Sequence, residues 1–123
     1  MKILIVEDED LAVKKLQKTL AAVDQDANVV GIADSIKGTV EWLQQNPAPD
    51  LILMDIQLPV IDGYEATRRI RAIPALAKVP IIAVTSYALS GDEAKTREAG
   101  CDGYVAKPFS PRQLLAKVRE FLP

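Results

Sequence analysis

Four short hydrophobic runs, each ending on polar residues, constrain the fold of this chain more than any other feature. The runs occupy residues 3–6, 51–54, 81–84 and 104–106. The polar residues that follow them are Glu7 and Asp8, Asp55, Thr85 and Lys107. If the runs are parallel strands, their carboxyl ends lie along one edge of a sheet, which is where open α/β sheets bind ligands. The sequence therefore predicts three carboxylates, a hydroxyl and an ammonium group in one cleft.

The hydrophobic runs alternate with amphipathic stretches of helical length, a pattern typical of repeated βα units. A further strand is expected at 28–33, and helices are expected at about 11–23, 36–45, 64–72, 90–100 and from 111 onward. Ser35 is expected to cap the second helix, and Ser110, Pro111 and Gln113 form a start signal for the last. The predicted fold is a (βα)5 α/β domain with a doubly wound parallel sheet.

Length and composition fit one globular domain. The chain has 123 residues, of which 49% are hydrophobic and 26% are charged, as is ordinary for soluble domains. This length supports one hydrophobic core but not two, so residues 1–123 are expected to form a single domain. The formal charge of −2 argues against nucleic acid as a direct ligand. Three neighbouring arginines are expected to form a solvated helix face: Arg68, Arg69 and Arg71.

The chain has one cysteine and no histidine, which excludes several kinds of chemistry. Cys101 is the only cysteine, so the chain can form neither an intrachain disulfide nor a cysteine metal site. We expect it to be a small, partly buried residue without a redox task. Histidine is absent, which excludes a Ser-His-Asp triad, a histidine general base and a phosphohistidine carrier. No signal peptide precedes the first run and no apolar run approaches the ~18 residues of a membrane span, so a cytoplasmic location is expected, with no membrane partner.

The carboxylates at the strand ends point to a metal. Asp55 taken alone could be a nucleophile, a metal ligand or a strand-end cap. Glu7 and Asp8 favour the first two roles over a cap, because clustered carboxylates repel one another unless a cation or a proton compensates them. Mg²⁺ is the natural cation for a short set of oxygen ligands, since it keeps several waters and binds one or two carboxylates together with phosphate oxygens.

A carboxylate beside Mg²⁺ can attack phosphorus and form an aspartyl phosphate. Phosphoryl transfer requires mainly alignment and charge neutralisation rather than acid–base groups. Lys107 could place a positive charge against one phosphoryl oxygen, and the Thr85 hydroxyl could donate to another. The residue types at the strand ends are therefore suited to phosphoryl transfer.

Four segments together closely resemble the receiver domains of two-component response regulators. They are residues 6–9 (VEDE), 53–59 (LMDIQLP), 83–86 (AVTS) and 103–109 (GYVAKPF). The resemblance covers the whole chain, with the segments in the usual order and at the usual spacing. It implies a flavodoxin-like fold with strand order 2-1-3-4-5.

The resemblance also implies the phosphorylation and metal sites. Asp55 would be the phosphoacceptor. Mg²⁺ would be held by Glu7, Asp8, Asp55 and the backbone carbonyl of Gln57. Glu7 departs from the commoner aspartate by one methylene, so it is expected to hold a metal-bound water rather than bind the ion directly. Ile61 stands where methionine is frequent, an apolar exchange that should leave the loop intact.

Further residues acquire roles from the same resemblance. Thr85 and Lys107 would contact the phosphoryl group, Tyr104 would be the aromatic switch residue, and Lys107-Pro108 is expected to be a cis peptide. Gln57 and Tyr87 would flank the path of the water that hydrolyses the aspartyl phosphate. Because the ring of Tyr87 is bulky, slow self-dephosphorylation is expected.

The leading hypothesis is a stand-alone receiver that takes a phosphoryl group from a histidine kinase or a histidine phosphotransfer protein. The chain would catalyse only its own phosphorylation and dephosphorylation. Since it stops at Pro123, output is expected through a downstream protein target, or a homodimer on activation, at residues 88–119. A phosphohydrolase of the haloacid dehalogenase type is a second hypothesis, but Gln57 stands where that family needs an aspartate, and a cap domain has no room. A non-phosphorylated adaptor of the same fold is the third.

Overall fold

The computed structural model describes residues 2–7, 10–23, 28–55, 63–85, 92–106 and 110–121. Strands and helices alternate along these residues. In chain order they are β1 (Lys2–Val6), α1 (Asp10–Val23), β2 (Asn28–Ala33), α2 (Ile36–Gln45), β3 (Leu51–Asp55), α3 (Gly63–Arg71), the 3₁₀ turn η1 (Pro74–Leu76), β4 (Ile81–Thr85), α4 (Asp92–Ala99), β5 (Gly103–Ala106) and α5 (Pro111–Phe121). The predicted βα alternation is confirmed, with α3 beginning and ending one residue earlier than expected.

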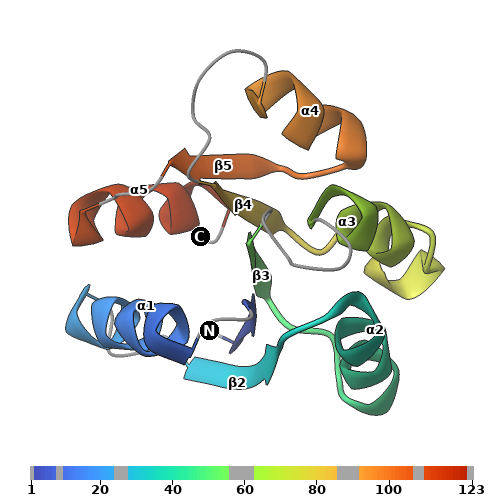
Figure 1. The fold of residues 1–123 in the computed structure, drawn as a ribbon, viewed down its shortest axis with the longest axis horizontal. Coiled ribbons are helices and arrows are strands. Elements are labelled where there is room, and N and C mark those ends of the chain that lie inside the picture. The colour runs from blue at the N-terminus through green and yellow to red at the C-terminus, as the bar shows by residue number, and fades with distance from the viewer. Residues whose placement is uncertain are drawn as a thin grey trace.

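The strands form one parallel sheet in the order β2-β1-β3-β4-β5. Helices α1 and α5 cover one face, whereas α2 and α3 cover the other, and α4 lies beyond β5 (Figure 1). Both faces of the central strands are therefore buried, which explains why 3–6 and 51–54 are uninterrupted hydrophobic runs. The predicted doubly wound flavodoxin-like topology is confirmed.

Alternation along the central strands divides the core into two clusters. Leu4, Val6, Ile52 and Met54 contribute to the cluster under α2 and α3. Ile3, Ile5, Leu51 and Leu53 contribute to the cluster under α1 and α5. Each side chain in these two lists is essentially inaccessible to solvent. Successive residues of a strand point to opposite faces, so the parity of a residue number on β1 and β3 tells which helices its side chain meets.

Helix ends follow the capping signals in the sequence. The Ser35 hydroxyl accepts a hydrogen bond from the backbone N–H of Gly38 at 3.0 Å. At the start of α5, the Gln113 N–H donates to Ser110 Oγ at 3.2 Å, and the Ser110 N–H donates to Gln113 Oε1 at 2.8 Å. This reciprocal pair is a capping box. Both predicted caps are confirmed.

Two aspartates fix the amino ends of the strands. Asp50 precedes β3, and its carboxylate accepts a hydrogen bond from the Lys2 N–H at 2.8 Å while its own N–H donates to the Lys2 carbonyl at 2.8 Å. Asp102 precedes β5 and repeats this arrangement with Ile81, at 2.9 Å and 2.8 Å. Each aspartate thus joins the first residue of a neighbouring strand, which sets the register of the pair.

Aromatic and helical features complete the fold. Trp42 of α2 is half-buried, and its ring lies against Gly31 of the edge strand β2, where no larger residue would fit without moving the ring. Trp42 therefore packs α2 against the edge of the sheet. None of the helices described has the length and apolarity needed to cross a membrane.

Candidate phosphorylation site

Two predicted site residues, Glu7 and Asp55, stand level with each other on neighbouring central strands. Val6 of β1 pairs with Met54 of β3, so the next residues along the two strands are Glu7 and Asp55. Both side chains are buried, at 3% and 5% exposure. Adjacent strands are about 5 Å apart. The fold therefore brings together two acidic residues that are 48 positions apart in the sequence (55 − 7).

The two acidic side chains also lie on the same face of the sheet. Ile5 and Leu53, two residues earlier on the same strands, belong to the core cluster under α1 and α5. Strand alternation assigns Glu7 and Asp55 to this same face, at the carboxyl edge where α1 begins. A cation bound at this edge would place its positive charge against both carboxylates. The oxygen-only chemistry of this pair fits Mg²⁺.

Strands β4 and β5 continue the carboxyl edge past Asp55. Asp55 pairs with Val84, and Thr85 is the next residue of β4. Thr85 in turn pairs with Ala106, the last residue of β5. The backbone of Thr85 is therefore one residue beyond the partner of Asp55, as the strand-end pattern predicts.

Several predicted site residues lie outside the described part of the chain. They are Asp8, Gln57, Tyr87 and Lys107, together with the Lys107-Pro108 peptide bond and the side chain of Thr85. Ile61 lies outside it as well. The structure thus brings together Glu7, Asp55 and the backbone of Thr85, and the roles expected of the others stay predictions.

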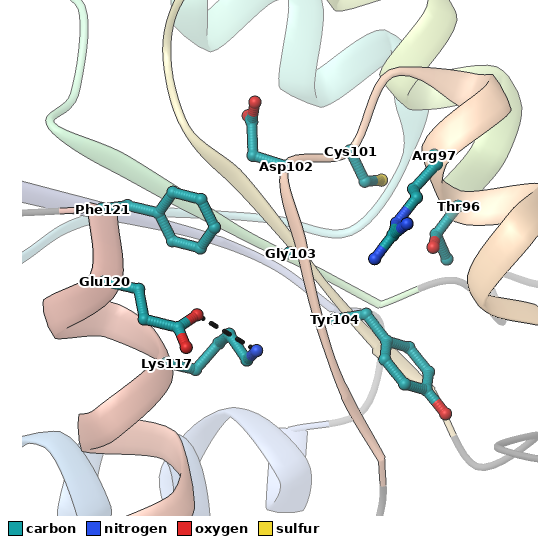
Figure 2. Close-up of a pocket in the computed structure, with 9 residues that line it drawn as sticks. All are labelled: Thr96, Arg97, Cys101, Asp102, Gly103, Tyr104, Lys117, Glu120 and Phe121. Atoms are coloured by element: carbon teal, nitrogen blue, oxygen red, sulfur yellow. Dashed lines mark ion pairs between the residues drawn. The ribbon is translucent and has the colours of Figure 1, made fainter.

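Tyr104, the expected switch residue, belongs to β5 and pairs with Ala83 of β4. Its side chain is partly buried and lines a groove of about 190 Å³ between α4, β5 and α5 (Figure 2). Arg97 of α4 and Phe121 of α5 line the same groove. On the α5 side, Lys117 and Glu120 form an ion pair at 3.1 Å. Tyr104 therefore lies on the surface that was expected to carry output.

The expectation for one of the three neighbouring arginines is wrong. Arg68 and Arg69 are exposed and pair with Glu65, each at 3.3 Å, as a solvated helix face requires. Arg71, by contrast, has a side chain that is only 18% exposed and forms an ion pair with Asp102. Helical periodicity alone did not indicate this, because the groups that bind Arg71 belong to distant segments. The only sequence signal is an acidic residue placed directly before a strand.

Cys101 was expected to be small and partly buried, and the structure places it among the buried core residues. Burial raises the pKa of its thiol above the ordinary value of 9.0, because the charged thiolate is poorly solvated there. The hydrogen-bonding contact with the Thr67 hydroxyl at 3.5 Å and the nearby charge of Arg71 act in the opposite direction on this pKa and only partly offset it. The thiol therefore stays protonated at neutral pH.

The fold and the carboxylate pair define a receiver domain, and comparison with known proteins agrees. The family model described as the response regulator receiver domain matches residues 3–119. The chain therefore belongs to the response regulator receiver family. This result favours the receiver hypothesis over the haloacid dehalogenase-type phosphohydrolase.

Individual relatives are similar over nearly their whole length. The polar-differentiation response regulator DivK of Brucella anthropi is 33% identical over 120 residues, which cover 98% of this chain and 94% of the relative. A response regulator structure from Chloroflexus aurantiacus has a TM-score of 0.89 at 31% identity, covering 98% and 96% of the two chains. The receiver domain of the sensor histidine kinase PA1611 from Pseudomonas aeruginosa has a TM-score of 0.85 at 36% identity, covering 98% and 95%. That structure holds a magnesium ion coordinated in its active-site cleft.

Proposed function

We propose that this receiver domain accepts a phosphoryl group on Asp55 from the phosphohistidine of a histidine kinase or a histidine phosphotransfer protein. The observation that carries the proposal is the pair of buried carboxylates, Glu7 and Asp55, at the ends of two central strands. A carboxylate that served only to cap a strand would have no need of a second one beside it. Membership of the receiver family supports the same role.

The proposed transfer is an in-line displacement at phosphorus. A carboxylate oxygen of Asp55 forms the new P–O bond while the P–N bond of the phosphohistidine breaks, and the imidazole leaves with its electron pair. Positioning supplies most of the rate, because phosphoryl transfer demands little acid–base help from the protein. Asp55 is the last residue of β3, a buried strand that pairs with β1 on one side and β4 on the other, and Asp55 itself pairs with Val84 of β4. The attacking carboxylate is thereby held at a fixed position.

Glu7, Asp8, Asp55 and the backbone carbonyl of Gln57 would hold Mg²⁺ in this proposal. Once bound, the ion would supply positive charge between the carboxylates and the incoming phosphoryl oxygens. Glu7 is buried beside Asp55 and would orient water rather than approach the phosphorus. Thr85 and Lys107 would donate hydrogen bonds to phosphoryl oxygens. The similar receiver that holds magnesium in its cleft supports a metal at this edge.

Output is proposed to pass through the face made by α4, β5 and α5. The new charge on Asp55 gives the Thr85 hydroxyl an additional acceptor, and its movement would let Tyr104 on the adjoining strand change rotamer. Such a switch shifts a population only if the phosphoryl group contacts the two states differently. Tyr104 lines the groove on this face, so its rotation would change the surface offered to a downstream protein or to a second copy of the chain.

Intact-mass measurement with acetyl phosphate and Mg²⁺ tests the proposal. We expect one added phosphoryl group in the parent, none in Asp55→Asn, and none when EDTA removes the metal. Asp34→Asn is the matched control, because Asp34 is an exposed aspartate that follows another strand, β2, at the same edge. It should be phosphorylated like the parent. An Asp55→Asn protein that still gains the group would refute the assignment, and a parent that gains none would favour the adaptor hypothesis.

A further inference from the structure

The Arg71 guanidinium joins three segments at the amino edge of the sheet. Arg71 is the last residue of α3, and its Nε donates to the Gly100 carbonyl at 2.9 Å. Its Nη1 lies within hydrogen-bonding distance of three carbonyls of the turn before β4, at 3.1, 3.2 and 2.7 Å: those of Leu76, Ala77 and Val79. Its Nη2 donates to the Asp102 carboxylate. One side chain thus holds α3, the α3–β4 turn and the α4–β5 turn together.

Asp102 extends this arrangement into the sheet. The carboxylate oxygen that accepts from Arg71 also accepts from the Ile81 N–H at 2.9 Å. Asp102 therefore joins the start of β5 to the start of β4. Figure 2 shows Asp102 at the turn that leads from Cys101 into Gly103. We refer to Arg71 and Asp102 as the amino-edge latch.

Helix α4 is attached to the rest of the domain at its carboxyl end, where the latch lies. Among its side chains at 94–99, which the structure describes, only Thr96 and Ala99 are buried. The Cys101 N–H donates to the Thr96 carbonyl at 2.9 Å and the Gly100 N–H to the Arg97 carbonyl at 3.0 Å, which is a Schellman motif. Gly100 has a φ of +108°, and a Cβ there would lie 2.9 Å from Arg71 Cγ. Glycine is therefore required at the point where α4 meets the latch.

We infer that the amino-edge latch anchors α4 at Gly100, so that the output face changes by a pivot of α4 about this end. The start of α4 lies toward the carboxyl edge of the sheet, near the ends of β4 and β5, because the helix runs antiparallel to the strands. A change that begins at Asp55 therefore acts on the end of α4 that lies opposite the latch. This pivot rests on the proposed function, whereas the anchor itself does not. Arg71 and Asp102 are positioning residues in this account.

Amide hydrogen exchange tests the anchor without any phosphodonor. Arg71→Lys keeps the charge but cannot reproduce the forked hydrogen bonds. We expect exchange at Gly100 and Cys101 to rise about tenfold or more beyond any change at Ile5 and Leu53 in the sheet centre. Arg69→Lys replaces an exposed arginine two residues away and is the matched control. It should leave amide exchange unchanged both at Gly100 and Cys101 and in the sheet centre. A uniform rise at all four amides, or none at Gly100 and Cys101, overturns the anchor.

If Arg71→Lys does not fold, Asp102→Asn provides the same test. The amide of asparagine can still accept from the Ile81 N–H but loses the charge that binds Arg71. The same local rise at Gly100 and Cys101 is expected. Unchanged exchange there in a folded Asp102→Asn protein overturns the anchor equally.

Spin-label distances test the pivot. In a Cys101→Ala background, one label replaces the exposed Ala94 or Glu98 of α4, and a reference label replaces the exposed Glu41 of α2. Mg²⁺ and beryllofluoride, which mimics the phosphoryl group, should change the 94–41 distance and leave the 98–41 distance unchanged. In Arg71→Lys both distances should change.

Two other outcomes of the spin-label experiment separate the inference from the proposed function. Equal movement at 94 and 98 in the parent, or movement at neither while beryllofluoride shifts the Asp55 amide resonance, overturns the pivot. If beryllofluoride leaves the Asp55 resonance unchanged, the proposed function fails and takes the pivot with it. The exchange measurements then decide the anchor alone.

Discussion

The two edges of the sheet use acidic residues in opposite ways. At the amino edge, Asp50 and Asp102 are exposed and donate and accept backbone hydrogen bonds that join neighbouring strands. At the carboxyl edge, Glu7 and Asp55 are buried next to each other. The exposed carboxylates at the amino edge complete the hydrogen bonding of strand ends. Gathering buried carboxylates, as at the carboxyl edge, costs free energy. We therefore propose that the amino edge serves stability and that the carboxyl edge serves chemistry.

Removing Arg71 should have the largest effect on stability. Arg71→Ala deletes an ion pair and leaves several carbonyls of the α3–β4 and α4–β5 turns without their donor, so we expect a loss of about 3 kcal/mol in the free energy of unfolding. Arg69→Ala, which removes only a surface ion pair, should cost about 0.5 kcal/mol. Urea denaturation measures both. A loss in Arg71→Ala no larger than that in Arg69→Ala would contradict a structural role for the amino edge.

Magnesium should stabilise the domain through the carboxyl edge alone. At a free Mg²⁺ concentration about 100 times Kd, binding to the native state adds about 2.7 kcal/mol to the free energy of unfolding. The gain should vanish in Asp55→Asn and persist in Asp102→Asn. Urea denaturation in EDTA and in Mg²⁺ provides the comparison. If Asp55→Asn gains as much as the parent, the ion binds elsewhere.

When metal is absent, replacing aspartate by asparagine should change the free energy of unfolding in opposite directions at the two edges. Asp55→Asn removes one of two neighbouring buried carboxylates and should raise the free energy of unfolding by about 1 kcal/mol. Asp102→Asn weakens the contact with Arg71 and should lower it by about 1 kcal/mol. Thermal unfolding in EDTA at neutral pH measures both changes. Two changes of the same sign would remove the distinction between the edges.

Much of this division could be predicted from the sequence, because strand ends are encoded locally. The runs that became β1, β3 and β4 and the polar residues after them gave Glu7, Asp55 and Thr85 their places. Capping residues gave the starts of α2 and α5 for the same local reason. The level placement of Glu7 and Asp55 required that the two strands be parallel neighbours and also that they pair in the register to which the Asp50–Lys2 hydrogen bonds contribute.

Arg71 was misjudged because its environment is not local. Its position after Arg68 and Arg69 suggests a solvated helix face, and hydropathy assigns all three to solvent. Its acceptors come from the turn before β4 and from the turn before β5, and only the folded chain path brings those carbonyls to one point. Asp102 stands directly before β5, and nothing else in the sequence marks it as the partner of Arg71. Polar contacts between distant turns leave no periodic signal.

The smallest expected effect concerns Cys101, which lies next to the amino-edge latch. Its pKa is raised in the folded state, so the unfolded thiol ionises first as the pH rises. The contribution of the protonated Cys101 thiol to the free energy of unfolding is therefore fully present below about pH 9. It is lost as the pH rises through the pKa of the folded state. Cys101→Ala should flatten the decline of stability above pH 9 relative to the parent. Equal slopes in urea denaturation at pH 8 to 10 would contradict this.

The number of phosphoryl groups per chain, measured by intact mass in matched aspartate variants, tests the division between the edges most directly. Parent, Asp55→Asn and Asp102→Asn are treated alike with acetyl phosphate and Mg²⁺ until the parent is saturated. The account predicts one group on the parent, one on Asp102→Asn and none on Asp55→Asn. A phosphorylated Asp55→Asn protein, or a folded Asp102→Asn protein that gains no group, would contradict it.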